Sequence, residues 1–475
     1  MENFTRTDIE YWIAVIEERA RAMGLDFSPQ EFIIESEERA REHLAYSGIV
    51  PRYTHWSFGK AYDQFETLYK HGVFTHLPYE LVINSNPCQA FLLEGNSPAI
   101  QLIVIAHVFA HNDFFKNNHF FTGTHPEEAL DLFAEHAAYI EKLIRRASEK
   151  DVEEALTAAH AIRNQRLTLP GSEGHQEGFN LIRFILEECP RLNRLQKDVL
   201  RIVDEEWEYF IPQIETKIMN EGWAAYWHTR ILEGLDLPQE LMTEVITENA
   251  KIVFGIRAGV VNPYHVGITM FTDIKRAWDR MARGDLRAGE TWDGHTGDEK
   301  IFAIRRVNKD PTFILNYLTL EAAEECYLVR FDENPERQVT AVSNEEGFNE
   351  IRETFSRQVG MRIFPVVRAA DGNYDGKGNL WLKHEFDGRM LDEEYLRKTL
   401  ERIYCFWRKP MYLETVKDAS ITVPYVANTT IKNAPYCHWY DGKNHQEYVL
   451  RLPADSPSQK DMEILREYIK RLAGF

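Results

Sequence analysis

The chain has 475 residues, of which 44% are hydrophobic and 12% aromatic, a composition that argues against intrinsic disorder. This length exceeds what one ordinary core supports, so we expect two or three domains. A formal net charge of -20 argues against broad, non-specific binding to nucleic acid or to an anionic membrane.

Cysteine usage and the first segment both indicate a cytoplasmic protein. The five cysteines form no CxxC pair, which excludes a thiolate zinc site and a disulfide framework and fits a reducing compartment. Residues 1–24 predict an amphipathic helix that opens with a capping box of Thr7 and Glu10, not a signal peptide. No stretch approaches an uninterrupted apolar run of about 18 residues, so we expect no membrane span.

Helical patterns dominate the chain as far as residue 290. Ser97 and Pro98 form an N-cap and first-turn pair, which opens a helix that runs into the stretch HVFAHNDFFKNNHFF, residues 107–121. Apolar residues recur at helical spacing in several further segments. These are 127–149, 151–165, 194–233 with a break at Pro212, 239–254 and 265–283.

The pattern changes near residues 290–310. Strand-like runs follow at 327–331, 338–342 and 361–367, and the turn residues DGNYDGKGN (371–379) predict a β-hairpin. Two more helices are expected at 392–408 and 457–472. The sequence therefore predicts an α+β multidomain protein, with a large mainly α-helical domain over 1–295 and a smaller α+β domain over 300–475.

Two histidines in the stretch 107–121 have the spacing of a metal site. His107 and His111 stand one turn apart on one face of the predicted helix. Two imidazoles placed in this way can supply two ligands to a divalent ion, which then needs a third ligand from elsewhere. Read without a metal, the same pair is a set of packed or hydrogen-bonded core histidines, and this alternative stays open.

The third ligand is predicted in the segment MNEGWAAYWH. Glu221 and His228 share a helical face there, and Gly222 with the alanines after it would let a neighbouring helix approach closely. The string EGWAxY also resembles the second ligand-bearing helix of helical HExxH metallopeptidases, a gluzincin-like helix pair. We therefore predict a site for Zn²⁺ or another divalent metal, held by His107, His111 and Glu221. His228 would be a fourth ligand or would orient the others.

The general base of such an enzyme is missing from the motif. Helical HExxH enzymes use the Glu of the motif to deprotonate the metal-bound water, and Val108 stands at that position here. The candidate catalytic base is then Asp113, or a group on another helix. The chain carries no GxGxxG, P-loop, GxSxG or kinase signature, which removes the commoner nucleotide-binding and serine-hydrolase interpretations.

Seven strings of the chain are long and unusual. They are RYTHWSFGKAYD (52–63), YELVINSNPCQAFLLEGN (79–96), HVFAHNDFFKNN (107–118), MNEGWAAYWH (219–228), NPYHVGITMFTDI (262–274), DPTFILNYLT (310–319) and GNLWLKHEFDGRMLDEEYLRKTLERIY (378–404). Together they resemble the stage V sporulation protein R family, SpoVR, over essentially the whole chain.

This resemblance implies a cytoplasmic bacterial protein linked to formation of the spore cortex, a peptidoglycan layer. It also implies a complex with an AAA+ serine-kinase-like protein and a von Willebrand A-like protein. It supplies no established reaction, so two hypotheses follow. The chain is a metal-dependent hydrolase acting on an amide or peptide-like cell-wall precursor, or it is a non-catalytic adaptor in the kinase-containing complex.

Overall fold

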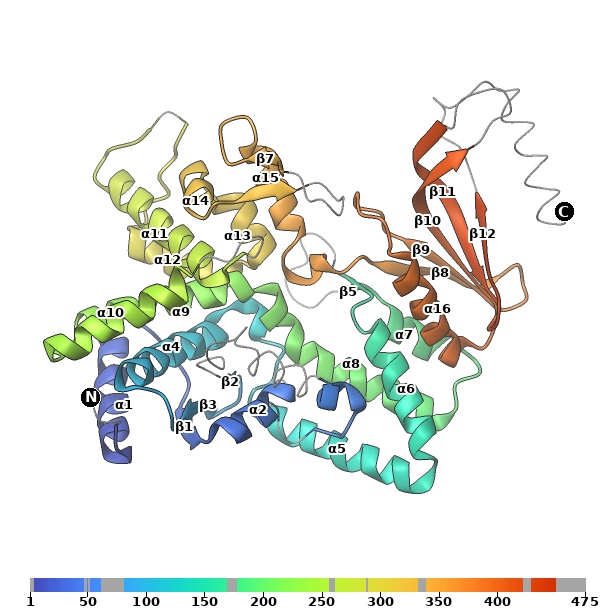
Figure 1. The fold of residues 1–475 in the computed structure, drawn as a ribbon, viewed down its shortest axis with the longest axis horizontal. Coiled ribbons are helices and arrows are strands. Elements are labelled where there is room, and N and C mark those ends of the chain that lie inside the picture. The colour runs from blue at the N-terminus through green and yellow to red at the C-terminus, as the bar shows by residue number, and fades with distance from the viewer. Residues whose placement is uncertain are drawn as a thin grey trace. The chain divides into compact units, whose positions relative to one another are not determined.

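The computed structural model describes residues 4–46, 49, 52–60, 81–168, 177–255, 261–287, 289–331, 339–421 and 429–449 (Figure 1). The fold is α+β and mainly helical, as the sequence predicts. It divides into two compact units, each built from two chain segments. The first unit holds Met1–Ala138 with Glu208–Ile363, and the second holds Tyr139–Trp207 with Phe364–Phe475. The predicted division near 290–310 follows the change from helices to strands, whereas these units exchange segments within α5 (Ala129–Arg146) and α8 (Arg194–Glu215).

Helices make up most of the first unit. They are α1 (Arg6–Ala22), α2 (Glu37–Ala45), α4 (Pro98–Asn117), α9 (Lys217–Glu233), α10 (Gln239–Val253), α11 (Pro263–Ala282), α12 (Gly297–Val307), α13 (Asp310–Tyr317), α14 (Leu320–Glu325) and α15 (Phe348–Arg357). Two small sheets accompany them. One has the order β1-β3-β2, from β1 (Gln30–Glu35), β2 (Leu81–Ile83) and β3 (Cys88–Leu93), and the other pairs β6 (Val329–Phe331) with β7 (Val339–Val342).

Helix α4 is the central helix of the first unit. Ser97 caps it and Pro98 opens it, as predicted, and every residue from Pro98 to Phe115 is buried. A helix that is buried on all sides must be covered on all sides. Helices α1, α9 and α10 pack against it, with α9 and α10 beside it in Figure 1.

A pair of glycines sets the crossing of α9 and α11. A Cβ added to Gly222 would lie 2.3 Å from the Cα of Gly267, so the two backbones are in direct contact. This confirms the expectation that the small residues of the segment MNEGWAAYWH admit a close neighbour. The crossing places the first turns of α9, and with them Glu221, firmly against the rest of the helical core.

Two helix boundaries differ from the sequence prediction. The capping box of α1 is formed by Thr5 and Asp8, not by Thr7 and Glu10, because both pairs have the required spacing and the helix begins at the earlier one. The break between α8 and α9 falls at Thr216, one turn after Pro212. A proline disturbs the turn that precedes it, so the helix continues past Pro212, whose carbonyl accepts a hydrogen bond from the Thr216 hydroxyl.

The second unit joins three whole helices, together with the end of α5 and the start of α8, to a five-stranded sheet. The helices are α6 (Glu149–Ile162), α7 (Leu181–Glu188) and α16 (Glu393–Trp407), and a short hairpin pairs β4 (Arg166–Thr168) with β5 (Glu177–Asn180). The sheet has the order β12-β11-β10-β9-β8, from β8 (Val367–Tyr374), β9 (Asn379–His384), β10 (Met411–Ile421), β11 (Thr429–Tyr440) and β12 (His445–Val449). All neighbours are antiparallel except β9 and β10, which are parallel.

Helix α16 covers one face of this sheet. Trp407 Nε1 donates to the carbonyl of Gly378, and the Tyr404 ring packs on that of Tyr440. The predicted hairpin is β8 and β9, whereas the predicted strand over 361–367 is a 3-10 turn, Gly360–Ile363, that leads into β8. The predicted helix over 457–472 lies outside the described residues. Among those described, no helix is long and apolar enough to cross a membrane.

Candidate metal centre

Three predicted ligands meet between α4 and α9. Nε2 of His107 and Nε2 of His111 each lie 3.5 Å from Oε2 of Glu221. The three donor atoms all lie within 4.8 Å of one another. The histidine side chains are 3% and 6% exposed and that of Glu221 is 17% exposed. Among the described residues, this is the one such group of histidine and carboxylate donors.

The spacing of the three atoms fits an ion between them. Two ligands held about 2.0–2.1 Å from a tetrahedral Zn²⁺ lie about 3.3–3.4 Å apart. A direct N–H···O hydrogen bond would instead bring the heavy atoms to about 2.7–3.2 Å. The observed 3.5 Å is closer to the edge of a coordination tetrahedron than to a hydrogen bond.

The charge of Glu221 suits a cation. Burial alone would raise the pKa of this carboxyl, but hydrogen bonds that the His107 and His111 side chains donate to it in the absence of a metal more than offset burial and hold its pKa well below the usual range. Glu221 is therefore a carboxylate at neutral pH. A buried carboxylate needs a compensating positive charge, which a divalent ion supplies.

The other nitrogen of each imidazole is already engaged. Nδ1 of His111 lies 2.8 Å from Oδ1 of Asn220, which accepts its hydrogen. Nδ1 of His107 lies 2.8 Å from Nδ1 of His228. Hydrogen bonds of this kind fix the orientation of a metal-binding imidazole and leave Nε2 for the ion.

His228 therefore stands behind His107 and does not join the three donor atoms. It is fully buried, and its Nε2 lies 2.7 Å from Oδ1 of Asn249 on α10. Burial, and then the nearby His107, lower the pKa of His228 to about 3, so this histidine is neutral. Its hydrogen bond to His107 is the contact through which an orienting role would act, and that role stays a prediction.

The structure does not bring Asp113 to the cluster. This carboxylate is fully buried, and it accepts hydrogen bonds from the backbone N–H of Asp26, from Nε1 of Trp223 and from the guanidinium of Arg305. Burial raises its pKa to about 6, although the Arg305 charge acts in the opposite direction. Both oxygens are thus committed to structural hydrogen bonds, and Val108 is buried in the hydrophobic core.

Tyr264 is a neighbour of the cluster that sequence reasoning missed. Its ring lies 5.8 Å from that of His107, measured between centroids. Asn262 places it there, because Oδ1 of Asn262 caps the backbone N–H groups of Tyr264 and His265 while its amide nitrogen donates to carbonyls at the end of α10. The signal in the sequence was the string NPYH, in which Asn and Pro mark a helix start.

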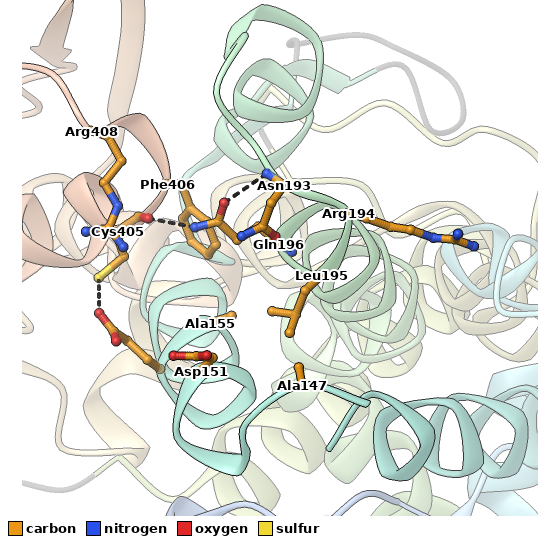
Figure 2. A pocket seen from close by; sticks show the side chains of 11 residues that line it. Ala147, Asp151, Ala155, Asn193, Arg194, Leu195, Gln196, Cys405, Phe406 and Arg408 are labelled. Atoms are coloured by element: carbon orange, nitrogen blue, oxygen red, sulfur yellow. Dashed lines mark hydrogen bonds between the residues drawn. The ribbon is translucent and has the colours of Figure 1, made fainter. Parts of the chain in front are cut away.

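A separate cavity lies within the second unit, and no residue of the cluster lines it. It has a volume of about 400 Å³ and lies beside the first turn of α8 and the end of α16 (Figure 2). Cys405 donates from Sγ to the carboxylate of Glu154, and Gln196 donates to the Cys405 carbonyl. Burial raises the pKa of the Cys405 thiol to about 11, so this cysteine is a poor nucleophile at neutral pH.

The fold and the cluster together define a mainly helical α+β protein in which two histidines and a glutamate meet between two helices. The chain belongs to the SpoVR family, because the model of SpoVR-like proteins matches residues 3–177 and 172–364. It is also similar to an uncharacterised protein, YcgB, of Escherichia coli (strain K12). The two are 28% identical over 471 residues, which cover 86% of this chain and 91% of that protein. No solved structure matches the chain.

Proposed function

We propose that this chain binds one divalent metal ion, Zn²⁺ in the first place, through Nε2 of His107, Nε2 of His111 and a carboxylate oxygen of Glu221. The observation that carries the proposal is the equal 3.5 Å approach of both imidazoles to one oxygen of Glu221. Two imidazoles and one carboxylate form the ligand set of zinc hydrolases and also of non-haem Fe²⁺ sites. Three protein ligands leave a coordination position open for a reactant.

The reaction that we propose is hydrolysis of an amide or peptide-like substrate related to the cell wall. A bound divalent ion would supply Lewis-acid polarisation of the scissile carbonyl. The role of the protein would be to hold the ion. Glu221 would contribute negative charge, and the two histidines would contribute neutral donor atoms. A role in spore cortex formation is supported by family membership, and its test is genetic.

Metal analysis of protein purified without a histidine tag tests the site. We expect about one equivalent of metal in the wild type and less than about a tenth in His107→Ala and Glu221→Gln. His265→Ala is the matched control, since His265 is a buried histidine of the same unit that packs on Phe254. Metal content that is negligible in the wild type, or equal in all four proteins, would refute the site.

Genetic complementation tests the reaction. Glu221→Gln should fail to restore sporulation in a deletion strain, whereas Glu215→Gln should restore it. Glu215 is a buried carboxylate nearby on the chain that pairs with Lys309 and not with the cluster. Full complementation by Glu221→Gln would contradict a metal-dependent reaction.

A second candidate function is favoured by the burial of the histidines. Side chains that are 3% and 6% exposed also suit a core whose histidines only maintain shape. The chain would then be a non-catalytic adaptor in a complex with an AAA+ serine-kinase-like protein and a von Willebrand A-like protein. Pull-down of these partners by His107→Ala at the wild-type level, together with full complementation, would favour the adaptor.

A further inference from the structure

We propose that Asn249, on α10, is a positioning residue that selects the metal-binding tautomer of His107 through His228. This inference rests on the proposed metal site and names the groups that set its affinity. Asn249 does not touch the three donor atoms. Its effect would pass through a series of hydrogen bonds in which each group donates to the next in the same sense.

The chain of hydrogen bonds starts at the backbone of α9. The hydroxyl of Thr229 donates to the carbonyl of Ala225 over 2.9 Å. Its oxygen is then left to accept, and it accepts from the amide nitrogen of Asn249 over 3.1 Å. An amide whose nitrogen faces Thr229 must turn its oxygen the other way, and Oδ1 of Asn249 lies 2.7 Å from Nε2 of His228.

The orientation of the Asn249 amide decides which nitrogen carries the hydrogen in each of two imidazoles, His228 and then His107. An amide oxygen can only accept, so Nε2 of His228 carries a hydrogen. A neutral imidazole has one N–H, which leaves Nδ1 of His228 as an acceptor. The partner of this nitrogen is Nδ1 of His107, 2.8 Å away, so His107 donates from Nδ1. In the neutral form of His107, which metal binding requires, Nε2 is then a nitrogen without hydrogen that faces Glu221.

The opposite tautomer of His107 would place a proton where the metal ion is proposed to bind. If His107 carried its hydrogen on Nε2, it would point this hydrogen at Oε2 of Glu221, and one proton would occupy both ligands. The chain from Thr229 through Asn249 and His228 opposes this tautomer of the neutral imidazole. Asn220 does the same for His111 in one step, because its Oδ1 accepts from Nδ1 of that histidine.

Two variants of Asn249 separate positioning from mere packing. Asn249→Leu removes the acceptor, so His228 and His107 can reverse and place a hydrogen between Nε2 and Glu221. Asn249→Asp keeps an acceptor for Nε2 of His228 and preserves the direction. Asn249 is half-buried on its helix, so both variants are expected to fold.

Competition with a chromophoric chelator gives the affinity of the full-length metal-free chain for Zn²⁺. We expect Asn249→Leu to bind about 10- to 100-fold more weakly than the wild type, the usual cost of losing an outer hydrogen bond of a ligand. Asn249→Asp should bind at least as tightly as the wild type, and its Co²⁺ complex should show the wild-type visible spectrum. Wild-type affinity in Asn249→Leu, or an equal loss in both variants, would overturn the inference. A wild type that binds no metal would instead defeat the proposed site itself.

Discussion

Replacing Gly267 with alanine tests whether the glycine crossing of α9 and α11 holds the first unit together. The added Cβ would lie 2.4 Å from Cα of Gly222 and 2.4 Å from the carbonyl oxygen of Ile218, where ordinary contacts begin near 3.4 Å. Both obstacles are backbone atoms, so no side chain can rotate away. The two helices must therefore separate by roughly 1 Å in a core that is packed without slack.

The magnitude follows from two opposing effects. Alanine favours a helix over glycine by about 1 kcal/mol, and overpacking of a tight core costs about 1–3 kcal/mol, with rigid backbone at the upper end. We therefore expect Gly267→Ala to lower the free energy of unfolding by about 1–2 kcal/mol. For a unit of this size that is a fall in Tm of about 2–8 °C.

Thermal unfolding followed by circular dichroism measures the effect on the metal-free protein. Gly59→Ala is the matched control, because an added Cβ there meets nothing within 4 Å and should leave Tm unchanged or raise it. Gly267→Ala should also weaken Zn²⁺ binding, since Glu221 directly precedes the displaced Gly222. A Gly267→Ala protein that melts at or above the wild-type temperature would refute the close crossing.

Three further predictions concern two buried carboxyl groups and the proposed metal ion. Asp113→Ala leaves the Arg305 guanidinium buried without its carboxylate, so the free energy of unfolding in urea should fall by about 3–5 kcal/mol, and an unchanged value would contradict this role. Burial raises the pKa of Asp310 to about 8, so the folded chain holds a proton that the unfolded chain releases above about pH 4. Stability should then decline as the pH rises from about 4 to about 8, and Asp310→Asn should flatten this decline in thermal melts across pH. Free Zn²⁺ at 100 times its Kd should stabilise the protein by about 2.7 kcal/mol, an increment that EDTA abolishes in the wild type and that Glu221→Gln lacks from the start.

The ligands of the candidate site could be predicted because they obey helical periodicity. His107 and His111 are four residues apart, and a helix puts such a pair on one face whatever surrounds it. Glu221 could be paired with these histidines only because small residues follow it and because the string EGWAxY resembles a ligand-bearing helix. Asn249 could not be found at all, because nothing local links a residue of α10 to a histidine 21 positions earlier on α9.

The parts of the fold that could be predicted are also those that follow from a local periodic pattern. The long helices α4, α9, α10 and α11 appear in the sequence pattern, and so does the hairpin of β8 and β9. The short strands β1 and β3 were missed because their residues pair in parallel across an intervening α2, a contact that no local pattern encodes. Helices α12 to α15 were also missed, since they are short, whereas α16 was predicted over 392–408.

The position of Asp113 shows why an activity assay alone cannot identify a base here. Two residues of a helix that are two apart lie about 200° apart around its axis, so Asp113 faces away from the side on which His111 meets Glu221. Asp113 nevertheless binds Trp223, two residues beyond Glu221 on α9, and so helps to fix α4 against α9. Loss of this hydrogen bond would move Glu221 relative to the histidines and so lower the proposed metal-dependent activity, even though Asp113 takes no part in proton transfer. Asp113→Asn should therefore lower both the stability of the metal-free protein and its affinity for Zn²⁺, whereas replacement of a true base would lower turnover and leave these two quantities unchanged.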